Sequence, residues 1–203
     1  MKKQYSQHGF DLVALEEFGQ GYFVEAGATN GINISNSYLL ELNGWDGICC
    51  EPNPKHHEAL SRNRSCNIEK KCLYDISGKT LEFAAGGALS GVVDDFAEPT
   101  RESKRKAMQQ IKVQTISLND LLEKYNAPFL TYLSLDTEGS ELKILKEFDF
   151  ARWSPRLISV EHNSQYREDN NAYLNSIISF MKEMKYEGEI IKSDILFRPN
   201  DKS

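Results

Sequence analysis

The chain has 203 residues, and 24 basic against 30 acidic side chains give it a net charge of −6. A chain of this length buries about 70% of its unfolded surface in one core, so we expect a single domain over residues 1–203 with a lead-in over residues 1–20. The excess of acidic over basic side chains argues against a nucleic-acid partner, because binding to nucleic acid needs a basic surface. No apolar run approaches the ~20 residues that cross a bilayer, which argues against a membrane partner. Four cysteines are too few for a disulfide scaffold. We therefore expect a soluble cytoplasmic protein.

Short apolar runs alternate with amphipathic segments in the first part of the chain. Ser35 is typical of an N-cap, and Pro54 suits the first turn of a helix. We expect strands over residues 21–26 and 47–50, and helices over residues 35–42 and 54–63.

The alternation continues to the C-terminus. A Ser-Gly-Lys turn at residues 77–79 predicts a hairpin, and residues 86–112 fit no element. We expect strands over residues 67–74, 80–84, 129–135 and 157–160, helices over 117–125, 140–148 and 174–184, and a final pair of strands around residue 193.

Strand-helix alternation predicts an α/β fold with a mostly parallel sheet and helices on both faces. The final hairpin would add an antiparallel strand at one edge. Ligands of such sheets bind beyond the carboxyl ends of the strands. The polar groups that follow the predicted strands, at residues 25–31, 51, 136–139 and 161–163, are therefore the candidate site.

A glycine turn follows the first predicted strand. Gly27 would let the backbone pass close to a ligand, where a side chain would collide. Glu51 ends the second strand 20 residues after Gly31. Nucleotide-binding sheets place a ribose-binding carboxylate at this position. The spacing indicates an adenosine-containing cofactor.

The details of the turn favour one cofactor over another. A dinucleotide site needs G-x-G-x-x-G, whose helix amides hold a pyrophosphate. This turn lacks the first G-x-G pair and begins with an acid, Glu25. A carboxylate repels a pyrophosphate but suits a cofactor with an amino group and a sulfonium. We therefore expect S-adenosylmethionine (SAM), with a nicotinamide-dependent Rossmann oxidoreductase as the alternative.

Three blocks of sequence resemble the FkbM family of SAM-dependent methyltransferases. They are FVEAGATNGINISNSYLLELNGWDGICCEPNP, YLSLDTEGSELKILKEFDF and ISVEHN. The leading YSQHGFDL is also similar to the family's approach to its first strand, so the resemblance covers nearly the whole chain. It implies a Rossmann-like class I methyltransferase with a seven-stranded sheet whose last strand is antiparallel.

The resemblance also implies cofactor contacts, residue by residue. These map to Glu25, Gly27, Asn30 and Gly31 for the methionine part, to Glu51 for the ribose, and to Pro52, Cys72 and Leu73 for the adenine. We count Ser35 among the cofactor contacts as well. Asp136 and Glu138 of the DTEGSE block would lie near the transferred methyl. The chain departs from the family at Ala26, where an Asp is commoner, and at Phe10, where a polar residue is commoner.

Acidic and imidazole side chains follow two strands that would be neighbours. Methyl transfer to a hydroxyl needs a group that takes the proton or lowers its pKa. Two hypotheses stay open. In one, His162 or Asp136 is the general base, with Glu138 beside it. In the other, Asp136, Glu161 and Asn163 bind Mg²⁺, which activates the hydroxyl.

Two further patterns bear on function. Cys49 and Cys50 are consecutive on a predicted buried strand, so their side chains point to opposite faces and a structural role is expected. The basic residues between Arg101 and Lys112 lie in the unassigned segment over residues 86–112. That segment is either a lid over an acidic substrate or a solvated helix face.

The sequence thus predicts an FkbM-type methyltransferase that acts on a hydroxyl oxygen. By analogy with the family, the acceptor is a sugar or glycan, or else a polyketide-like natural product. A non-catalytic SAM-binding module is a further alternative. The chain could also form a homodimer, but no exposed apolar stripe is legible in the sequence.

Overall fold

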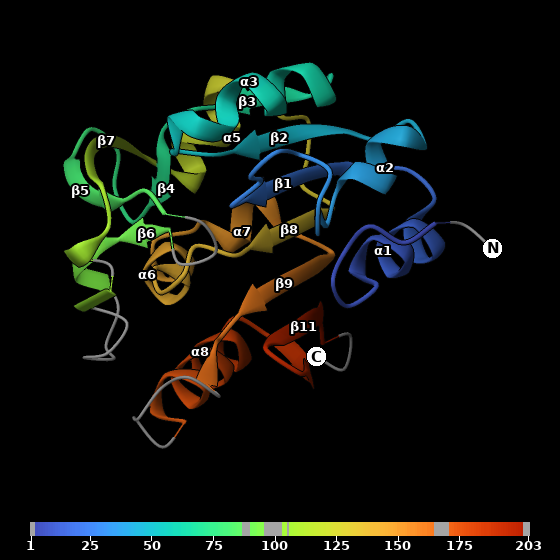
Figure 1. The fold of residues 1–203 in the computed structure, drawn as a ribbon. Helices are drawn as coiled ribbons and strands as arrows, with labels where there is room; N and C mark the ends of the chain where they lie inside the picture. The colour runs from blue at the N-terminus through green and yellow to red at the C-terminus, as the bar shows by residue number, and fades with distance from the viewer. Residues whose placement is uncertain (1–2, 87–89, 96–102, 105, 165–170, 201–203) are drawn as a thin grey trace.

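The computed structural model describes residues 3–86, 90–95, 103–104, 106–164 and 171–200. Seven strands form one sheet, in the order β10-β11-β9-β8-β1-β2-β3 (Figure 1). Their bounds are β1 Tyr22–Ala26, β2 Asp46–Cys50, β3 Asn67–Glu69, β8 Tyr132–Leu135, β9 Leu157–Glu161, β10 Tyr186–Ile191 and β11 Asp194–Pro199. This is the expected α/β, Rossmann-like sheet.

The strands run parallel from β3 through β2, β1 and β8 to β9. Only β11 reverses direction, and it pairs antiparallel with both β9 and β10. The expected antiparallel C-terminal strand is confirmed, and it lies one place in from the edge, where β10 is the edge strand. The reason is that β10 and β11 form a hairpin, and it is the second strand of the hairpin that pairs with β9.

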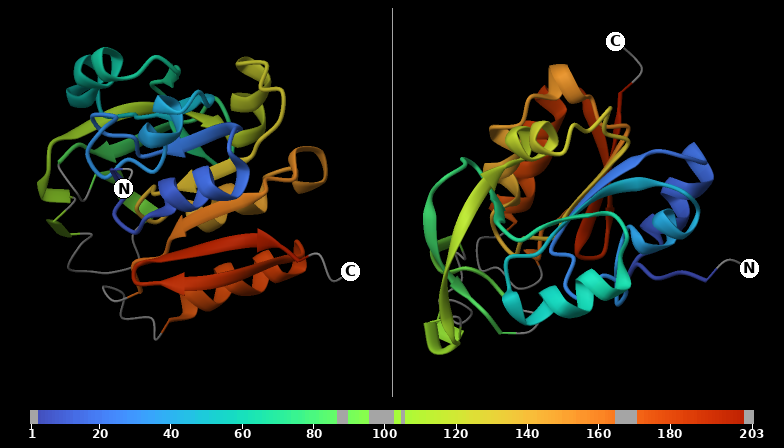
Figure 2. Two further views of the ribbon diagram at one scale, coloured as in Figure 1. Left: turned by 90° about the vertical axis from the view of Figure 1, so that its right-hand side faces the viewer. Right: turned by 90° about the horizontal axis from the view of Figure 1, so that it is seen from above.

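Helices cover both faces of this sheet (Figures 1 and 2). They are α1 Phe10–Phe18, α2 Tyr38–Leu42, α3 Pro54–Asn63, α5 Leu118–Lys124, α6 Glu141–Lys146, α7 Phe150–Trp153 and α8 Ala172–Glu183. Alternate side chains of each strand point to opposite faces, and they sort into two apolar clusters. Phe23 and Cys49 pack on one face with α1, α2 and α3, whereas Val24 and Cys50 pack on the other with α5, α6 and α8. The opposite orientations predicted for Cys49 and Cys50 are confirmed.

A second sheet of four strands, in the order β4-β7-β5-β6, lies beyond β3. Its strands are β4 Cys72–Tyr74, β5 Thr80–Ala84, β6 Gly91–Val92 and β7 Gln110–Ser117, and a 3₁₀ turn at Val93–Asp95 follows β6. The expected strand over residues 67–74 is broken into β3 and β4, which belong to different sheets. The predicted hairpin with residues 80–84 is also wrong, because the long strand β7 pairs with β4 through residues 115–117 and with β5 through residues 110–114.

The helix N-termini show which polar side chains act as caps. Ser117 caps α5 as expected, accepting a hydrogen bond from the backbone N–H of Asp120 (3.2 Å). Ser140 precedes α6, but its hydroxyl donates to Asp95 instead of capping the helix (2.5 Å). The expected helix over residues 35–42 starts only at Tyr38, although the Ser35 hydroxyl accepts the backbone N–H of Tyr38 (3.0 Å).

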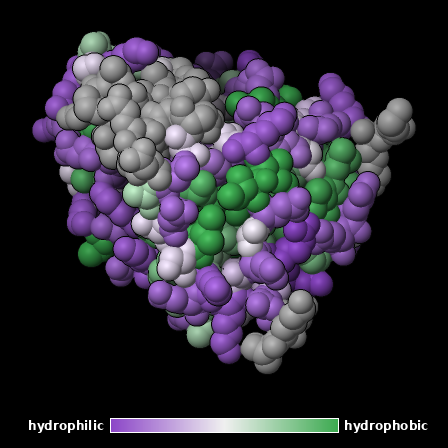
Figure 3. All heavy atoms as spheres, turned by 90° about the horizontal axis from the view of Figure 1, so that it is seen from below, coloured by the Kyte–Doolittle hydropathy of each residue, from purple (hydrophilic) through white to green (hydrophobic). Residues whose placement is uncertain are grey.

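The outer surface bears on membrane and subunit contacts. Within the described ranges, no helix is both long and apolar enough to cross a bilayer. Seen from below, apolar side chains gather in the middle of one face and polar side chains surround them (Figure 3). Ile34 and Ile190 are more than half exposed. The homodimer stays a prediction.

Packing beneath the sheet gives a test of the core. Leu121 of α5 is fully buried, so we expect Leu121→Ala to lower the free energy of unfolding by about 2–5 kcal/mol. Leu42, which is 57% exposed, gives the control. Leu42→Ala should change the free energy of unfolding by less than about 0.5 kcal/mol. Urea unfolding followed by circular dichroism measures both. Equal losses would contradict the burial assigned to α5.

Candidate active site

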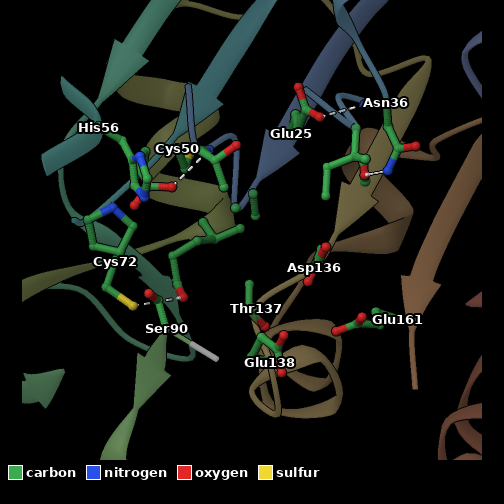
Figure 4. Close-up of a pocket in the computed structure, with 18 of the residues that line it drawn as sticks. Glu25, Asn36, Cys50, His56, Cys72, Ser90, Asp136, Thr137, Glu138 and Glu161 are labelled. Atoms are coloured by element: carbon green, nitrogen blue, oxygen red, sulfur yellow. Dashed lines mark hydrogen bonds between the residues drawn. The ribbon is translucent and has the colours of Figure 1, made fainter. Parts of the chain in front are cut away.

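A cavity of about 210 Å³ lies at the carboxyl ends of β1, β2 and β8, where they meet the second sheet (Figure 4). Eight residues that the sequence singled out line it: Glu25, Gly27, Glu51, Pro52, Leu73, Asp136, Glu138 and Glu161. Cys72, placed by the resemblance near the adenine, lines it too. Five others do not: Asn30, Gly31, Ser35, His162 and Asn163.

The turn after β1 brings the backbone to the cavity wall. Gly27 has a φ of 85°, a left-handed conformation that favours glycine. A Cβ atom at Gly27 would overlap with the backbone oxygen of Asp136. The N–H groups of Gly27 and Ala28 both donate to the carbonyl of Cys50 (3.0 and 3.2 Å). Glycine is therefore required where β1, β2 and β8 converge.

Glu25 is the buried centre of a polar network. Its Oε1 accepts the backbone N–H of Asn36 (2.6 Å), and its Oε2 accepts the hydroxyls of Ser35 (2.8 Å) and Ser37 (2.5 Å). Ser35 therefore holds Glu25 from behind the cavity, in a positioning role rather than as part of the cavity lining. The network fixes the segment between β1 and α2.

Arg64, directly after α3, completes this network. Its Nη1 lies 3.4 Å from Glu25 Oε2 and 3.1 Å from the carbonyl oxygen of Gly31, and its Nε lies 2.5 Å from Glu41 Oε2. Arg64 is only 5% exposed. A buried carboxylate needs such a partner, because burial without one is very costly. Sequence reasoning missed Arg64, which is distant from every motif.

Glu51 lies at the end of β2, opposite the glycine turn. Its Oε2 accepts the backbone N–H of Thr29 (2.8 Å) and its Oε1 that of Asn53 (2.7 Å). Burial raises the pKa of Glu51, while these two backbone hydrogen bonds lower it. Each carboxylate oxygen retains a second lone pair for a ligand hydroxyl.

Apolar side chains form the wall beside Glu51. Leu73 and Cys72 come from β4 and Phe83 from β5, with Pro52 following Glu51. Phe83 was not predicted, because no sequence motif indicated that β5 would border the site. Cofactor sites are commonly lined by apolar side chains of this kind. Such a wall suits a flat, weakly polar ring.

Three carboxyl groups meet on the other side of the cavity. Asp136, Glu138 and Glu161, here called the carboxyl cluster, each offer an oxygen within 4.8 Å of the others (Figure 4). Burial raises the pKa of Asp136 to about 7, and the side chains of Asp136 and Glu161 lie within hydrogen-bonding reach. Burial first, and then the charges of Asp136 and Glu138, raise the pKa of Glu161 as well. A carboxyl group with a pKa near 7 suits proton transfer at neutral pH.

Glu141, in the first turn of α6, holds the loop that carries Glu138. Its Oε1 accepts the backbone N–H groups of Thr137 (2.9 Å) and Gly139 (3.1 Å). Glu138 has a φ of 61°, and these bonds stabilise that unusual backbone conformation. The hydroxyl of Tyr173 donates to Glu141 Oε2 (2.7 Å). The final acid of the DTEGSE block is thus a structural anchor.

His162 occupies a different place from the one expected of a general base. Its Nδ1 accepts the backbone N–H of Ser164 (3.0 Å), and its Nε2 donates to the carbonyl of Lys192 (3.1 Å). Burial lowers its pKa. Both ring nitrogens are thus engaged with backbone, and the ring ties the end of β9 to the β10–β11 turn.

Two expected ligands lie outside the cavity lining. Asn163 donates through its side-chain amide to Glu138 Oε2 (3.4 Å). The third member of the carboxyl cluster is therefore Glu138, in place of the expected Asn163. Asn30 folds back on its own loop, where its Oδ1 accepts the N–H groups of Ile32 (3.1 Å) and Asn33 (2.9 Å). Asn30 therefore shapes the turn instead of reaching the cavity.

Several lining residues had no clear signal in the sequence. Gln7 lines the cavity because two contacts hold the segment before it. Ser6 forms an isolated β-bridge with Ile34, and Asp11 accepts the backbone N–H of Tyr5 (2.8 Å). The remaining members not singled out as site residues are Ala26, Thr29, Ile34, Asn36, Cys50, His56, Ser90, Ser134 and Thr137. Most lie at strand ends or follow strands directly, so the rule that ligands bind at carboxyl ends could have found them.

The basic segment is only partly described. Arg101 and Arg105 lie outside the described residues. Lys104, Lys106 and Lys112 are exposed, and none of them lines the cavity. The lid over an acidic substrate stays a prediction.

Arg64 provides a test of the network. We expect Arg64→Met to lower the free energy of unfolding by about 3–5 kcal/mol, because the Glu25 carboxylate would be buried without its charged partner. Arg62, exposed on α3, gives the matched control, and Arg62→Met should leave the free energy of unfolding nearly unchanged. Denaturant unfolding measures both variants. A small loss for Arg64→Met would show that Glu25 does not depend on the ion pair.

The chain matches the model of one protein family, the methyltransferase FkbM domain, over residues 25–187. No curated protein matches it significantly. Among solved structures, it is similar to a TehB-like SAM-dependent methyltransferase from Corynebacterium glutamicum, with 10% identity, a TM-score of 0.46, and coverage of 95% of this chain and 86% of that one. It is also similar to a chain of a fibrillarin/Nop5p complex, with 14% identity, a TM-score of 0.43, and coverage of 95% and 79%. The family match spans most of the sequence, and the chain belongs to the FkbM methyltransferase domain family.

Proposed function

We propose that this protein transfers a methyl group from SAM to a hydroxyl oxygen. The observation that carries the proposal is the position of Glu51, a buried carboxylate that faces a cavity between the bare Gly27 backbone and an apolar wall. Membership of a methyltransferase family supports it.

The residues present fit SAM. Gly27 lines the cavity with bare backbone, and its missing side chain lets the turn pack directly against the backbone oxygen of Asp136. Glu51 offers its free lone pairs to ribose hydroxyls, and Leu73 and Phe83 offer an apolar surface to adenine. Glu25 and the backbone around it would face the amino group of the methionine part. When bound, SAM supplies a methyl group activated by its sulfonium sulfur.

The carboxyl cluster supplies the remaining chemistry. Asp136 accepts the proton of the acceptor hydroxyl while that oxygen forms its bond to the methyl carbon. The sulfur of bound SAM would be the leaving group and would keep the electron pair of the carbon–sulfur bond. Holding the hydroxyl against the methyl contributes further, since orientation alone supplies up to about 7–11 kcal/mol.

Metal-assisted proton removal is a second mechanism that the carboxyl cluster would allow. Its oxygen ligands would be Asp136, Glu138 and Glu161, rather than Asp136, Glu161 and Asn163. Turnover in EDTA and with added Mg²⁺ separates the two mechanisms. Full turnover in EDTA would exclude the metal.

The acceptor class follows from the family analogy alone. We propose a sugar or glycan, with a polyketide-like natural product next. A methyl-release assay over a panel of such acceptors tests the class. Calorimetric titration with SAM and with NADH tests the cofactor: binding of NADH without SAM would overturn the proposal. SAM binding without transfer to any acceptor would favour a non-catalytic module.

Glu51 gives the sharpest test of the cofactor site. We expect Glu51→Gln to weaken SAM binding by about 10- to 100-fold, because hydrogen bonds to a charged group contribute about 1.5–3 kcal/mol. Glu58→Gln, on the exposed side of α3, is the control and should bind as the wild type does. Isothermal titration calorimetry measures both. Unchanged affinity for Glu51→Gln would remove the ribose contact from the proposal.

The pH dependence tests the base. Asp136 must be ionised to accept a proton, so kcat/KM should fall as the pH drops below about 7 and level off above it. Asp136→Asn should lower kcat by about 10²- to 10⁴-fold. A pH profile with the same inflection in the variant would assign the base to another group.

The same substitution has an opposite effect on stability. Because burial raises the pKa of Asp136 above its ordinary value of 3.8, ionisation destabilises the folded chain as the pH rises from about 4 to about 7. Asp136→Asn should therefore unfold at a higher temperature than the wild type at pH 8. Thermal unfolding at pH 5 and pH 8 measures this difference.

A further inference from the structure

We propose that the carboxyl cluster binds a protonated amino group of the acceptor, so that the substrate is an amino-bearing polyol such as an amino sugar. The inference rests on the proposed methyl transfer and names the chemical class of its acceptor. The methylated hydroxyl would be a neighbour of the amino group on the same molecule.

The first argument is charge. In the described part of the chain, no Lys or Arg side chain lines the cavity, whereas five carboxyl groups do. Glu25 is paired with Arg64, and Glu51 accepts two backbone N–H groups. Asp136 and Glu161, by contrast, face each other as two acids. One sulfonium from SAM would offset only part of the charge of the carboxyl cluster.

The second argument is an orphaned atom. Glu161 Oε2 is buried and has no hydrogen-bond partner among the described residues. Such an atom normally receives a donor from protein, water or ligand. Figure 4 shows the Glu161 carboxylate directed towards Glu138 and Asp136, into the cavity. A ligand with several N–H donors would satisfy it.

The third argument is spacing. An ammonium donates three hydrogen bonds of about 2.8 Å, which places its acceptors about 4.6 Å apart when the donors point tetrahedrally. The cluster oxygens all lie within 4.8 Å of one another, so an ammonium between Glu138 and Glu161 can reach an oxygen of each.

The surroundings reinforce the preference for a cation. Asp194 pairs with Glu161 across β9 and β11, and Glu141 supports the loop on the other side. Their charges raise the pKa of Asp136, after the larger effect of burial. His8 lies 3.2 Å from Asp194. His162 is occupied by backbone on both nitrogens. A phosphate beside the methyl would meet repulsion from three sides.

The reaction stays balanced with this acceptor. The ammonium keeps its three protons and is not attacked, because its nitrogen has no lone pair. The neighbouring hydroxyl loses its proton to Asp136 and gains the methyl, while the sulfur keeps the electron pair of the broken bond. Glu138 and Glu161 then hold the amino group and set the affinity.

The test compares matched acceptors. Glucosamine, N-acetylglucosamine and glucose 6-phosphate are titrated by calorimetry into protein saturated with S-adenosylhomocysteine at pH 7.5, without turnover. We expect glucosamine to bind at least tenfold more tightly than either other sugar. Glu138→Gln and, separately, Glu161→Gln should abolish that preference. Glu187→Gln, on the exposed face of β10, should retain it.

The outcomes separate this inference from the proposed function. Equal binding of all three sugars, no binding of glucosamine, or tighter binding of the phosphate would overturn it, even if SAM binds and methyl transfer proceeds. Loss of turnover in EDTA with recovery in Mg²⁺ would also overturn it, because the cation would then be a metal. Failure of SAM to bind would instead overturn the proposed function.

Discussion

The site depends on one buried ion pair, that between Glu25 and Arg64. Glu25 lies near the end of β1 at the centre of the sheet, and Arg64 directly follows α3. Between them they fix Ser35, Ser37 and the backbone of Gly31. Because a lone buried charge is so unfavourable, neither side chain can move alone. The turn at Gly27 and the loop to α2 are therefore fixed before any ligand arrives, and such preorganisation reduces the entropy lost on binding.

Much of the fold could be predicted from the sequence, because the central strands of the large sheet are buried on both sides. Short apolar runs such as residues 21–26 and 47–50, bounded by turn residues, are typical of such strands. The smaller sheet could not be predicted in the same way. Strand β7 joins β4 and β5 over different halves of its length, and its alternation of apolar and polar residues breaks near Thr115. A single strand with two partners shows no single period.

The site could be predicted to the extent that its residues follow strands or belong to the family motifs. Glu51 and Asp136 were found because each is the first polar residue after an apolar run. His162 follows β9 in the same way, yet it faces the β10–β11 turn, because one position separates the two sides of a strand. Arg64 could not be found at all, since only tertiary contacts bring it to the site, and Gln7 was indicated only by its place in the YSQHGFDL block.

The reversal of β11 has a consequence for how the protein could diversify. Residues from the first half of the chain form the pocket around Glu51, whereas the carboxyl cluster comes from the ends of β8 and β9 and is flanked by Asp194 of the terminal hairpin. The two regions meet at Gly27 and Asp136, which line the same cavity. Changes in the hairpin turn near Ser193 can therefore alter what approaches the methyl without disturbing nucleoside recognition. A scaffold divided in this way lets a lineage acquire new chemical targets while its donor stays the same.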